Sequence, residues 1–160
     1  MKKAALLMMA AMTLTGCTKG DNSMGETLVE KLYVTIGEVT HSVTLEDNVA
    51  TLAMVAALRT GDITYTAHDY GGFEKVGALG QSFPSDDHRI GTSAGDLVLY
   101  EGDNVCIFYG SNSWSYTRIG KFDNLSADEV RRFVKAGQGK VTVTLSLQPI
   151  YKNPTKKTSL

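Results

Sequence analysis

Alternation of apolar and polar residues with a period of two is the feature that most constrains the fold of this chain. The clearest case is 141–148, where Val or Leu occupies every second position and Thr, Ser or Gln lies between. This pattern is typical of a strand with one buried and one polar face. The same alternation, or a short apolar run, recurs in six further segments: 32–36, 39–45, 63–67, 97–100, 105–109 and 114–122. The sequence therefore predicts seven or more short strands.

Two turns indicate how some of these strands pair. Gly37-Glu38 lies between the first two strands, and Glu101-Gly102-Asp103-Asn104 lies between 97–100 and 105–109, so both pairs are expected to form hairpins. The two strands of the second hairpin have no polar face. We therefore expect them to be central strands that are covered on both sides.

Two helices are expected between the strands. Asp47 is the expected N-cap of the first, which ends before Gly61. Its apolar residues at helical spacing are Val49, Leu52, Ala53 and Ala56. The fold class that follows is mainly β: a closed or nearly closed β-barrel with two helices over its openings.

The second helix carries a complete set of end signals. Ser126 and Glu129 have the spacing of a capping box, and Leu125 and Val130 that of a hydrophobic staple. The expected buried stripe is Val130, Phe133 and Val134, and Gly137 is the expected stop.

Five motifs in a fixed order carry a resemblance to a known family. They are Leu45-Glu46-Asp47-Asn48, the run 69–77 (DYGGFEKVG), Gly95-Asp96-Leu97-Val98-Leu99-Tyr100, Ile107-Phe108-Tyr109 and Ile119-Gly120. Together they resemble the small bacterial cyclophilin-like proteins over about residues 32–124. The resemblance implies a cyclophilin-type β-barrel, but a fold does not by itself carry an activity.

Catalytic cyclophilins isomerise prolyl bonds with an arginine followed five positions later by phenylalanine, then a methionine and a glutamine. The residues five positions after the arginines at 59, 89, 118, 131 and 132 are Thr, Ala, Asp, Ala and Gly. No catalytic residue is therefore carried over from the family. We expect a non-catalytic module that binds a peptide or a small polar ligand, and a divergent prolyl isomerase is the alternative.

The N-terminus resembles a bacterial lipoprotein signal. Lys2 and Lys3 precede a short apolar stretch that ends in Leu14-Thr15-Gly16-Cys17, which resembles a lipobox. We expect residues 1–16 to be the signal peptide and Cys17 to carry the lipid. Residues 17–27 would be a flexible tether. This resemblance implies a location in the cell envelope. Because Thr18, not Asp, follows the cysteine, the resemblance to Gram-negative lipoproteins favours the outer membrane over retention in the inner membrane.

The remaining boundaries and partners follow from composition. Residues 28–150 are expected to form the single barrel domain and 151–160 a polar tail. With 16 basic and 17 acidic residues the formal charge is −1, so no nucleic-acid partner is expected. Once Cys17 is lipidated, Cys106 is the only other cysteine, and its apolar strand predicts a buried, inert thiol.

Aromatic residues in or beside glycine-rich segments, together with one acid and one base, are the candidates for a ligand groove. They are Tyr70, Phe73, Glu74, Phe83, Trp114, Tyr116 and Arg118. The competing interpretation is that most of these rings fill the barrel. Glu74 lies beside apolar residues and needs a partner, for which Lys75, Arg118 and solvent are the candidates.

Enzymatic alternatives have weaker signals. His68, Asp69, Asp86 and His88 flank the glycine-rich middle of the chain and could converge as a metal-dependent or hydrolytic site. The chain has no H-x-x-x-H pair. We therefore expect no metal and no other cofactor.

Overall fold

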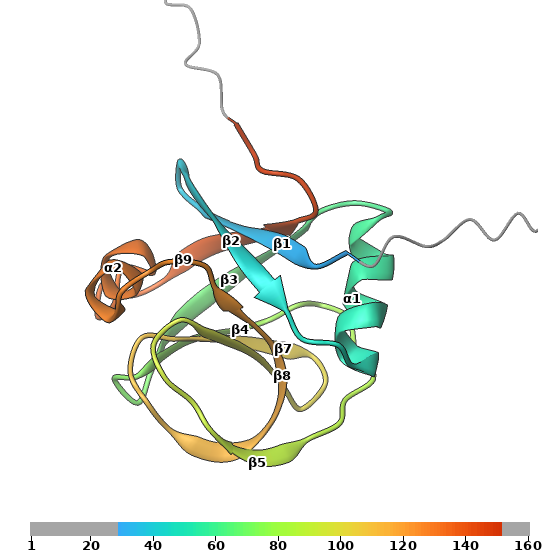
Figure 1. The fold of residues 1–160 in the computed structure, drawn as a ribbon. Coiled ribbons are helices and arrows are strands. Elements are labelled where there is room, and N and C mark those ends of the chain that lie inside the picture. The colour runs from blue at the N-terminus through green and yellow to red at the C-terminus, as the bar shows by residue number, and fades with distance from the viewer. Residues whose placement is uncertain (1–28, 152–160) are drawn as a thin grey trace, which may run out of the picture.

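Eight antiparallel strands close into a barrel in the computed structural model, which describes residues 29–151 (Figure 1). Around the barrel the order is β2, β1, β9, β3, β4, β7, β6 and β8, and the pairing of β2 with β8 closes it. The strands are β1 (Lys31–Ile36), β2 (Val39–Leu45), β3 (Ile63–Tyr70), β4 (Glu74–Ala78), β6 (Asp96–Tyr100), β7 (Asn104–Phe108), β8 (Ser113–Phe122) and β9 (Val141–Ser146). The predicted β-barrel with two helices is confirmed.

The longest strand, β8, belongs both to the barrel and to an extension outside it. Its first residues pair with β5 (His88–Gly91), its middle with β6, and its last residues with β2. The register shifts between Leu97 and Val98, where β6 meets β8. Such an irregularity bends a strand. The β5–β8 ribbon consequently lies beside the outer wall of the barrel.

The barrel interior is a continuous apolar core. Side chains from the strands and both helices contribute, and many are completely buried, among them Leu32, Val43, Leu99, Ile107 and Leu145. Each such side chain contributes about 1.5–3 kcal/mol through the removal of apolar surface from water. This core holds the strands in register, so outward-facing residues occupy defined positions.

Helix α1 (Val49–Leu58) forms where the sequence predicts it, but its cap and its buried face differ. The N-cap is Asn48, whose side chain accepts from the Thr51 amide, and not Asp47. Met54 and Leu58 are buried, whereas Val49 and Leu52 are each 53% exposed. The helix is apolar on all sides, so the spacing of its apolar residues does not identify the face that packs on the barrel.

Helix α2 (Ala127–Phe133) confirms its predicted start. Ser126 and Glu129 form both halves of the capping box, and Val130, Phe133 and Val134 are buried in the core. The chain leaves the helix through Gly137, which has a φ of +76°. Figure 1 shows α1 and α2 on opposite sides of the barrel.

The outer wall carries a second, smaller apolar cluster. Val98, Cys106, Phe108 and Tyr116 form it, and partly buried side chains such as Phe73 and Tyr100 pack against it. Strands β6 and β7 are thus buried on both faces, as their apolar runs predict. Strands β4 and β5 have no such run, and the sequence did not identify them.

The expected signal peptide (1–16), lipidated Cys17, tether (17–27) and most of the polar tail (151–160) lie outside the described residues. Within 29–151, no helix is long and apolar enough to cross a membrane.

Candidate ligand site on the outer wall

A pocket of about 850 Å³ opens on the outer wall of the barrel. Strands β3, β4, β6, β7 and β8 surround it, together with the tight turn between β3 and β4. The residues that line it are His68, Tyr70, Gly71, Phe73, Glu74, Val76, Tyr100, Asn104, Asn112, Trp114 and Tyr116. Five of the seven predicted groove residues are among them, which brings Tyr70, Phe73, Glu74, Trp114 and Tyr116 together.

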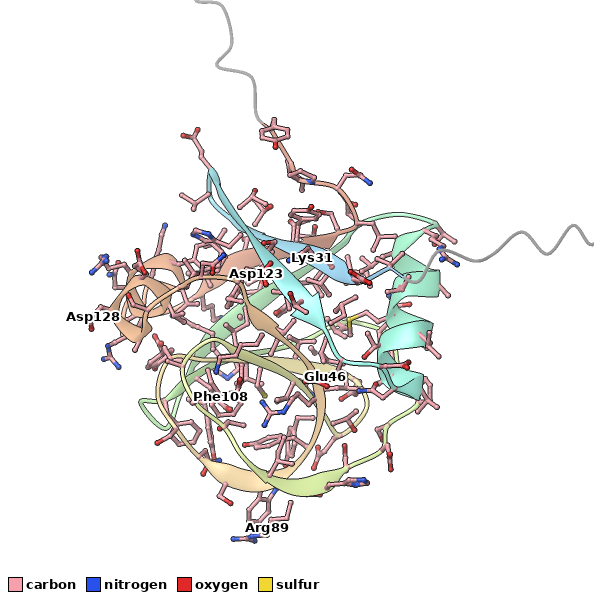
Figure 2. The ribbon with its side chains drawn as sticks, in the orientation of Figure 1. Lys31, Glu46, Arg89, Phe108, Asp123 and Asp128 are labelled. Carbon is pink, nitrogen blue, oxygen red and sulfur yellow. The ribbon has the colours of Figure 1, made fainter. Side chains whose placement is uncertain are left out.

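The aromatic rings hold one another in place. Phe73 stacks on Phe108 with ring centroids 6.1 Å apart and an interplanar angle of 4°. Tyr116 meets Phe108 edge-on at 5.5 Å, and Tyr100 meets Tyr116 at 5.9 Å. Figure 2 labels Phe108, the completely buried ring at the centre of this group. Edge-on and offset pairs of this kind add about 0.5–1.5 kcal/mol each, so the pocket floor is largely preformed.

The turn between β3 and β4 requires glycine. Gly71 has a φ of +59°, and a Cβ atom there would lie 2.2 Å from the ring of Phe73. The turn thus lets Phe73 fold back over the sheet, where its carbonyl accepts from the amides of Tyr109 and Gly110. Tyr70, 60% exposed, and Trp114, 53% exposed, remain at the rim.

Glu74 places a buried carboxyl in the pocket wall. The residue is only 5% exposed, and no described residue forms a hydrogen bond with its Oε2 atom. Burial raises the pKa of Glu74 from 4.5 to about 7, although a hydrogen bond with the Cys106 thiol opposes part of this increase. The same burial, with the Glu74 charge, raises the pKa of Cys106 far above its usual range. Cys106 is thus the buried, inert thiol that the sequence predicts.

Of the predicted partners of Glu74, Lys75 and Arg118 are wrong, and for Lys75 the reason is that residues alternate across a strand. Lys75 lies on the opposite face of β4, where its Nζ atom is 2.9 Å from Asp69 Oδ2 and donates to the Gly139 carbonyl. Asp69 also accepts from Tyr109 and from the amides of Gly137 and Gly139. Burial alone would raise the pKa of Asp69, but these four donors lower it to about 2. The pair therefore fastens the loop after α2 to the barrel.

Two predicted groove residues do not line the pocket. Phe83 is 8% exposed and belongs to the interior core. Arg118 forms an ion pair with Asp96 at 2.8 Å and donates to the Gly91 carbonyl. The remaining lining residues were not predicted as groove residues: His68, Gly71, Val76, Tyr100, Asn104 and Asn112. Tyr100 could have been found, since it alternates in phase with Val98 on the outward face of β6.

The metal-binding alternative has little support. Asp69 is bound to Lys75, and His68 faces the outer pocket. Asp86 and His88 lie 3.6 Å apart and are both about two-thirds exposed. In the part of the chain that the structure describes, no three His, Cys, Asp or Glu side chains are grouped so that they could hold a metal ion.

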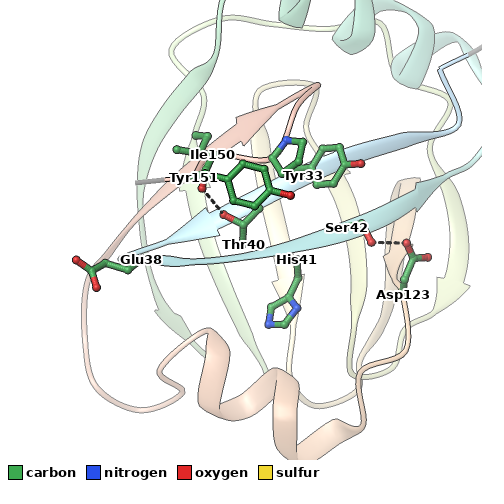
Figure 3. Close-up of a pocket in the computed structure, with 9 residues that line it drawn as sticks. Tyr33, Glu38, Thr40, His41, Ser42, Asp123, Ile150 and Tyr151 are labelled. Carbon is green, nitrogen blue, oxygen red and sulfur yellow. Dashed lines mark hydrogen bonds between the residues drawn. The ribbon is translucent and has the colours of Figure 1, made fainter. Parts of the chain in front are cut away.

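A second pocket, of about 500 Å³, lies between β2 and the segment 149–151 (Figure 3). Three of its polar side chains already have partners: Asp123 accepts from Lys31, Ser42 and Thr44, and Thr40 donates to the Ile150 carbonyl. In Figure 3, His41 points toward α2, where it packs edge-on against Phe133 with centroids 4.6 Å apart. The outer-wall pocket is the stronger candidate because it alone contains a buried carboxyl oxygen without a described partner.

The closed barrel with an outer-wall aromatic pocket defines the class of the protein: a cyclophilin-type β-barrel. The model of the cyclophilin-like family matches residues 34–146. The chain therefore belongs to the cyclophilin-like family, and the match extends beyond the predicted region to include α2 and β9.

Solved structures give the same fold. A hypothetical protein from Archaeoglobus fulgidus is 20% identical, with a TM-score of 0.54; the match covers 78% of this chain and 100% of that one. The structure of McbB in complex with tryptophan is 11% identical, with a TM-score of 0.55; it covers 76% of this chain and 46% of McbB. No curated protein matches. At these identities the likeness shows the fold alone.

Proposed function

We propose that this protein is a lipid-anchored component of the cell envelope whose barrel binds a peptide or a small ligand without catalysis. The observation that carries the proposal is the outer-wall pocket, where aromatic side chains surround a buried carboxyl group that has an oxygen without a described partner. Apolar walls with a few inward polar groups are typical of ligand sites.

The absence of the cyclophilin arginine motif from the sequence supports binding over isomerisation. Arg118 belongs to β8, a strand that contributes to the pocket, but it pairs with Asp96. A prolyl isomerase would therefore have to use a different set of residues.

The proposed lipid anchor rests on Lys2, Lys3 and the Leu14–Cys17 motif of the sequence. In cells fed a labelled fatty acid, the wild-type chain should carry the label and the Cys17→Ala variant should not. A wild-type chain without label would contradict anchoring.

Trp114 offers a direct test of binding because it is the only tryptophan of the chain and lies at the pocket rim. A panel of X-Pro peptides is titrated against Trp114 fluorescence, and the same peptides are used in a cis/trans isomerisation assay. Free tryptophan is also titrated, by calorimetry, because the structure of McbB is a complex with tryptophan. Binding without acceleration is the expected outcome.

A matched pair of variants locates the binding. Tyr70→Ala removes an exposed rim ring, and Val49→Ala removes a comparably exposed side chain from α1. Weaker binding in Tyr70→Ala alone supports the site. Accelerated isomerisation that is lost in Tyr70→Ala would favour the isomerase alternative, and failure of every ligand to bind would overturn the proposal.

A further inference from the structure

The pocket on the outer wall has one acidic side chain and no lysine or arginine to neutralise it; its one histidine is His68. Among its lining residues Glu74 is the only carboxylic acid, and none is Lys or Arg. The two basic side chains that the sequence offered as partners of Glu74 are engaged elsewhere, Lys75 with Asp69 and Arg118 with Asp96. A carboxylate only accepts hydrogen bonds, so Glu74 lacks the strong donor that a buried carboxylate requires.

The surroundings of Glu74 suit a cation. The rings of Tyr70, Phe73, Tyr100, Trp114 and Tyr116 line the same pocket, and the faces of aromatic rings attract ammonium groups within about 6 Å. A bound ammonium group could donate to the free Oε2 atom while its carbon substituents lie against the rings. A charge-assisted hydrogen bond of this kind is about twice as strong as a neutral one.

We infer that the ligand of this pocket is an organic ammonium compound whose nitrogen binds the Glu74 carboxylate and whose apolar part contacts the aromatic rings. The inference rests on the proposed function, since it names the chemical class of ligand for the same pocket. An anionic ligand would be repelled by Glu74. A neutral ligand that offers a carbonyl group would need Glu74 to be protonated, so the pH dependence of binding separates the two classes.

Ammonium binding requires ionised Glu74 and should strengthen as pH rises. With a pKa of about 7, roughly one tenth of the carboxyl is ionised at pH 6 and roughly nine tenths at pH 8, so affinity should rise about tenfold. Cys106, Tyr109 and Tyr116 interact electrostatically with Glu74, and His68, Tyr70 and Tyr100 line the same pocket. Burial raises the pKa of each of the first three, both tyrosines to about 12, so none of them ionises in this window. A His68→Asn variant removes the only basic side chain of the lining.

The test titrates the full chain with three probes of similar shape: benzylamine, benzyl alcohol and benzoate. Trp114 fluorescence reports binding, and the titrations are repeated at pH 6, 7 and 8. At pH 8 benzylamine should bind at least about tenfold more tightly than benzyl alcohol, and Glu74→Gln should abolish this preference. Asp128→Asn, which neutralises an exposed carboxylate on α2 (Figure 2) that does not line the pocket, should leave this preference unchanged.

Several results would overturn the inference. They are equal or tighter binding of benzyl alcohol or benzoate, an unchanged preference in Glu74→Gln, and no binding of benzylamine. If benzyl alcohol binds and Tyr70→Ala weakens it, the pocket is still a ligand site and only the ammonium class is wrong. Should Glu74→Gln fail to fold, the pH series of benzamidine, which keeps its positive charge and its N–H donors from pH 6 to pH 8, replaces the variant. The affinity of benzamidine for wild type and for His68→Asn must rise between pH 6 and pH 8, and a flat or falling profile contradicts the inference.

Discussion

Replacing Glu74 with glutamine should stabilise the protein above neutral pH and have little effect in acid. The pKa of Glu74 rises from 4.5 in an ordinary environment to about 7 in the folded protein, mainly because burial penalises the ionised form. Below pH 4.5 the carboxyl is neutral in both the folded and the unfolded chain. As pH rises from 4.5 to 7, the unfolded chain loses this proton first, so the stability of the folded protein falls.

The size of this effect follows from the two pKa values. At 1.36 kcal/mol per pKa unit, the difference between 4.5 and about 7 corresponds to about 3 kcal/mol at pH 8. Glutamine has nearly the same shape and cannot ionise, so Glu74→Gln avoids this cost. For a domain of this size, 3 kcal/mol corresponds to an increase in Tm of roughly 10 °C.

Urea unfolding followed by circular dichroism at pH 5, 6, 7 and 8 measures the difference between Glu74→Gln and wild type. The contribution of His41, which lies outside this pocket, is common to both proteins and cancels in the difference. For Asp128→Asn, a substitution at an exposed site, the free energy of unfolding should follow the same pH dependence as that of the wild-type protein. A Glu74→Gln variant that is less stable than wild type at pH 8 would refute the reasoning, because it would mean that the ionised carboxyl stabilises the fold.

Three other substitutions test the remaining contacts. Asp69→Asn should lower the free energy of unfolding, measured in urea, by about 3–5 kcal/mol, because it leaves the completely buried Lys75 without its counterion. The stability that ionised Asp69 gives the wild-type protein should be lost as pH falls from 3.8 toward 2, since the pKa of Asp69 is about 2 in the folded protein. A loss below 1 kcal/mol in Asp69→Asn would contradict this. Ser126→Ala should cost about 1 kcal/mol through loss of the capping box, and an unchanged urea midpoint would argue against that cap. Trp114→Ala should weaken ligand binding, measured by calorimetry, while Tm shifts by no more than a few degrees, because the ring is 53% exposed; a large fall in Tm would assign the ring to the core.

Features that depend on neighbouring residues could be predicted from the sequence. The start of α2 is one example, since the Ser126–Glu129 pair satisfies free amides within a single turn. The two-sided burial of β6 and β7 is another, because an apolar run without a polar face needs cover on both sides. The buried face of α1 could not be predicted, because the helix is apolar on every side and only its packing on the barrel decides which residues are covered.

Only part of the candidate site could be predicted, because the site combines residues that are distant in the sequence. Rings beside glycine-rich turns indicated a groove, but proximity in sequence does not identify the face of the sheet from which a side chain projects. The prediction was therefore wrong for Phe83, which lies in the interior core, and for Arg118, which pairs with Asp96. Strand β4 escaped detection because its sequence, EKVGA, contains two charged residues in a buried setting. Their burial depends on partners that are distant in the sequence.

Those two charged residues also explain how one strand can serve both the fold and a ligand site. Lys75 and Glu74 are neighbours, so they project from opposite faces of β4. On the inner face Lys75 contacts two acceptors, Asp69 and the Gly139 carbonyl, and this contact fastens the loop after α2 to the barrel. On the outer face Glu74 has the Cys106 thiol and one oxygen without a described partner. If the free oxygen served the fold alone, a neutral isostere would be the more stable choice at physiological pH. The cost of this carboxylate is therefore best explained by the ligand that it would bind.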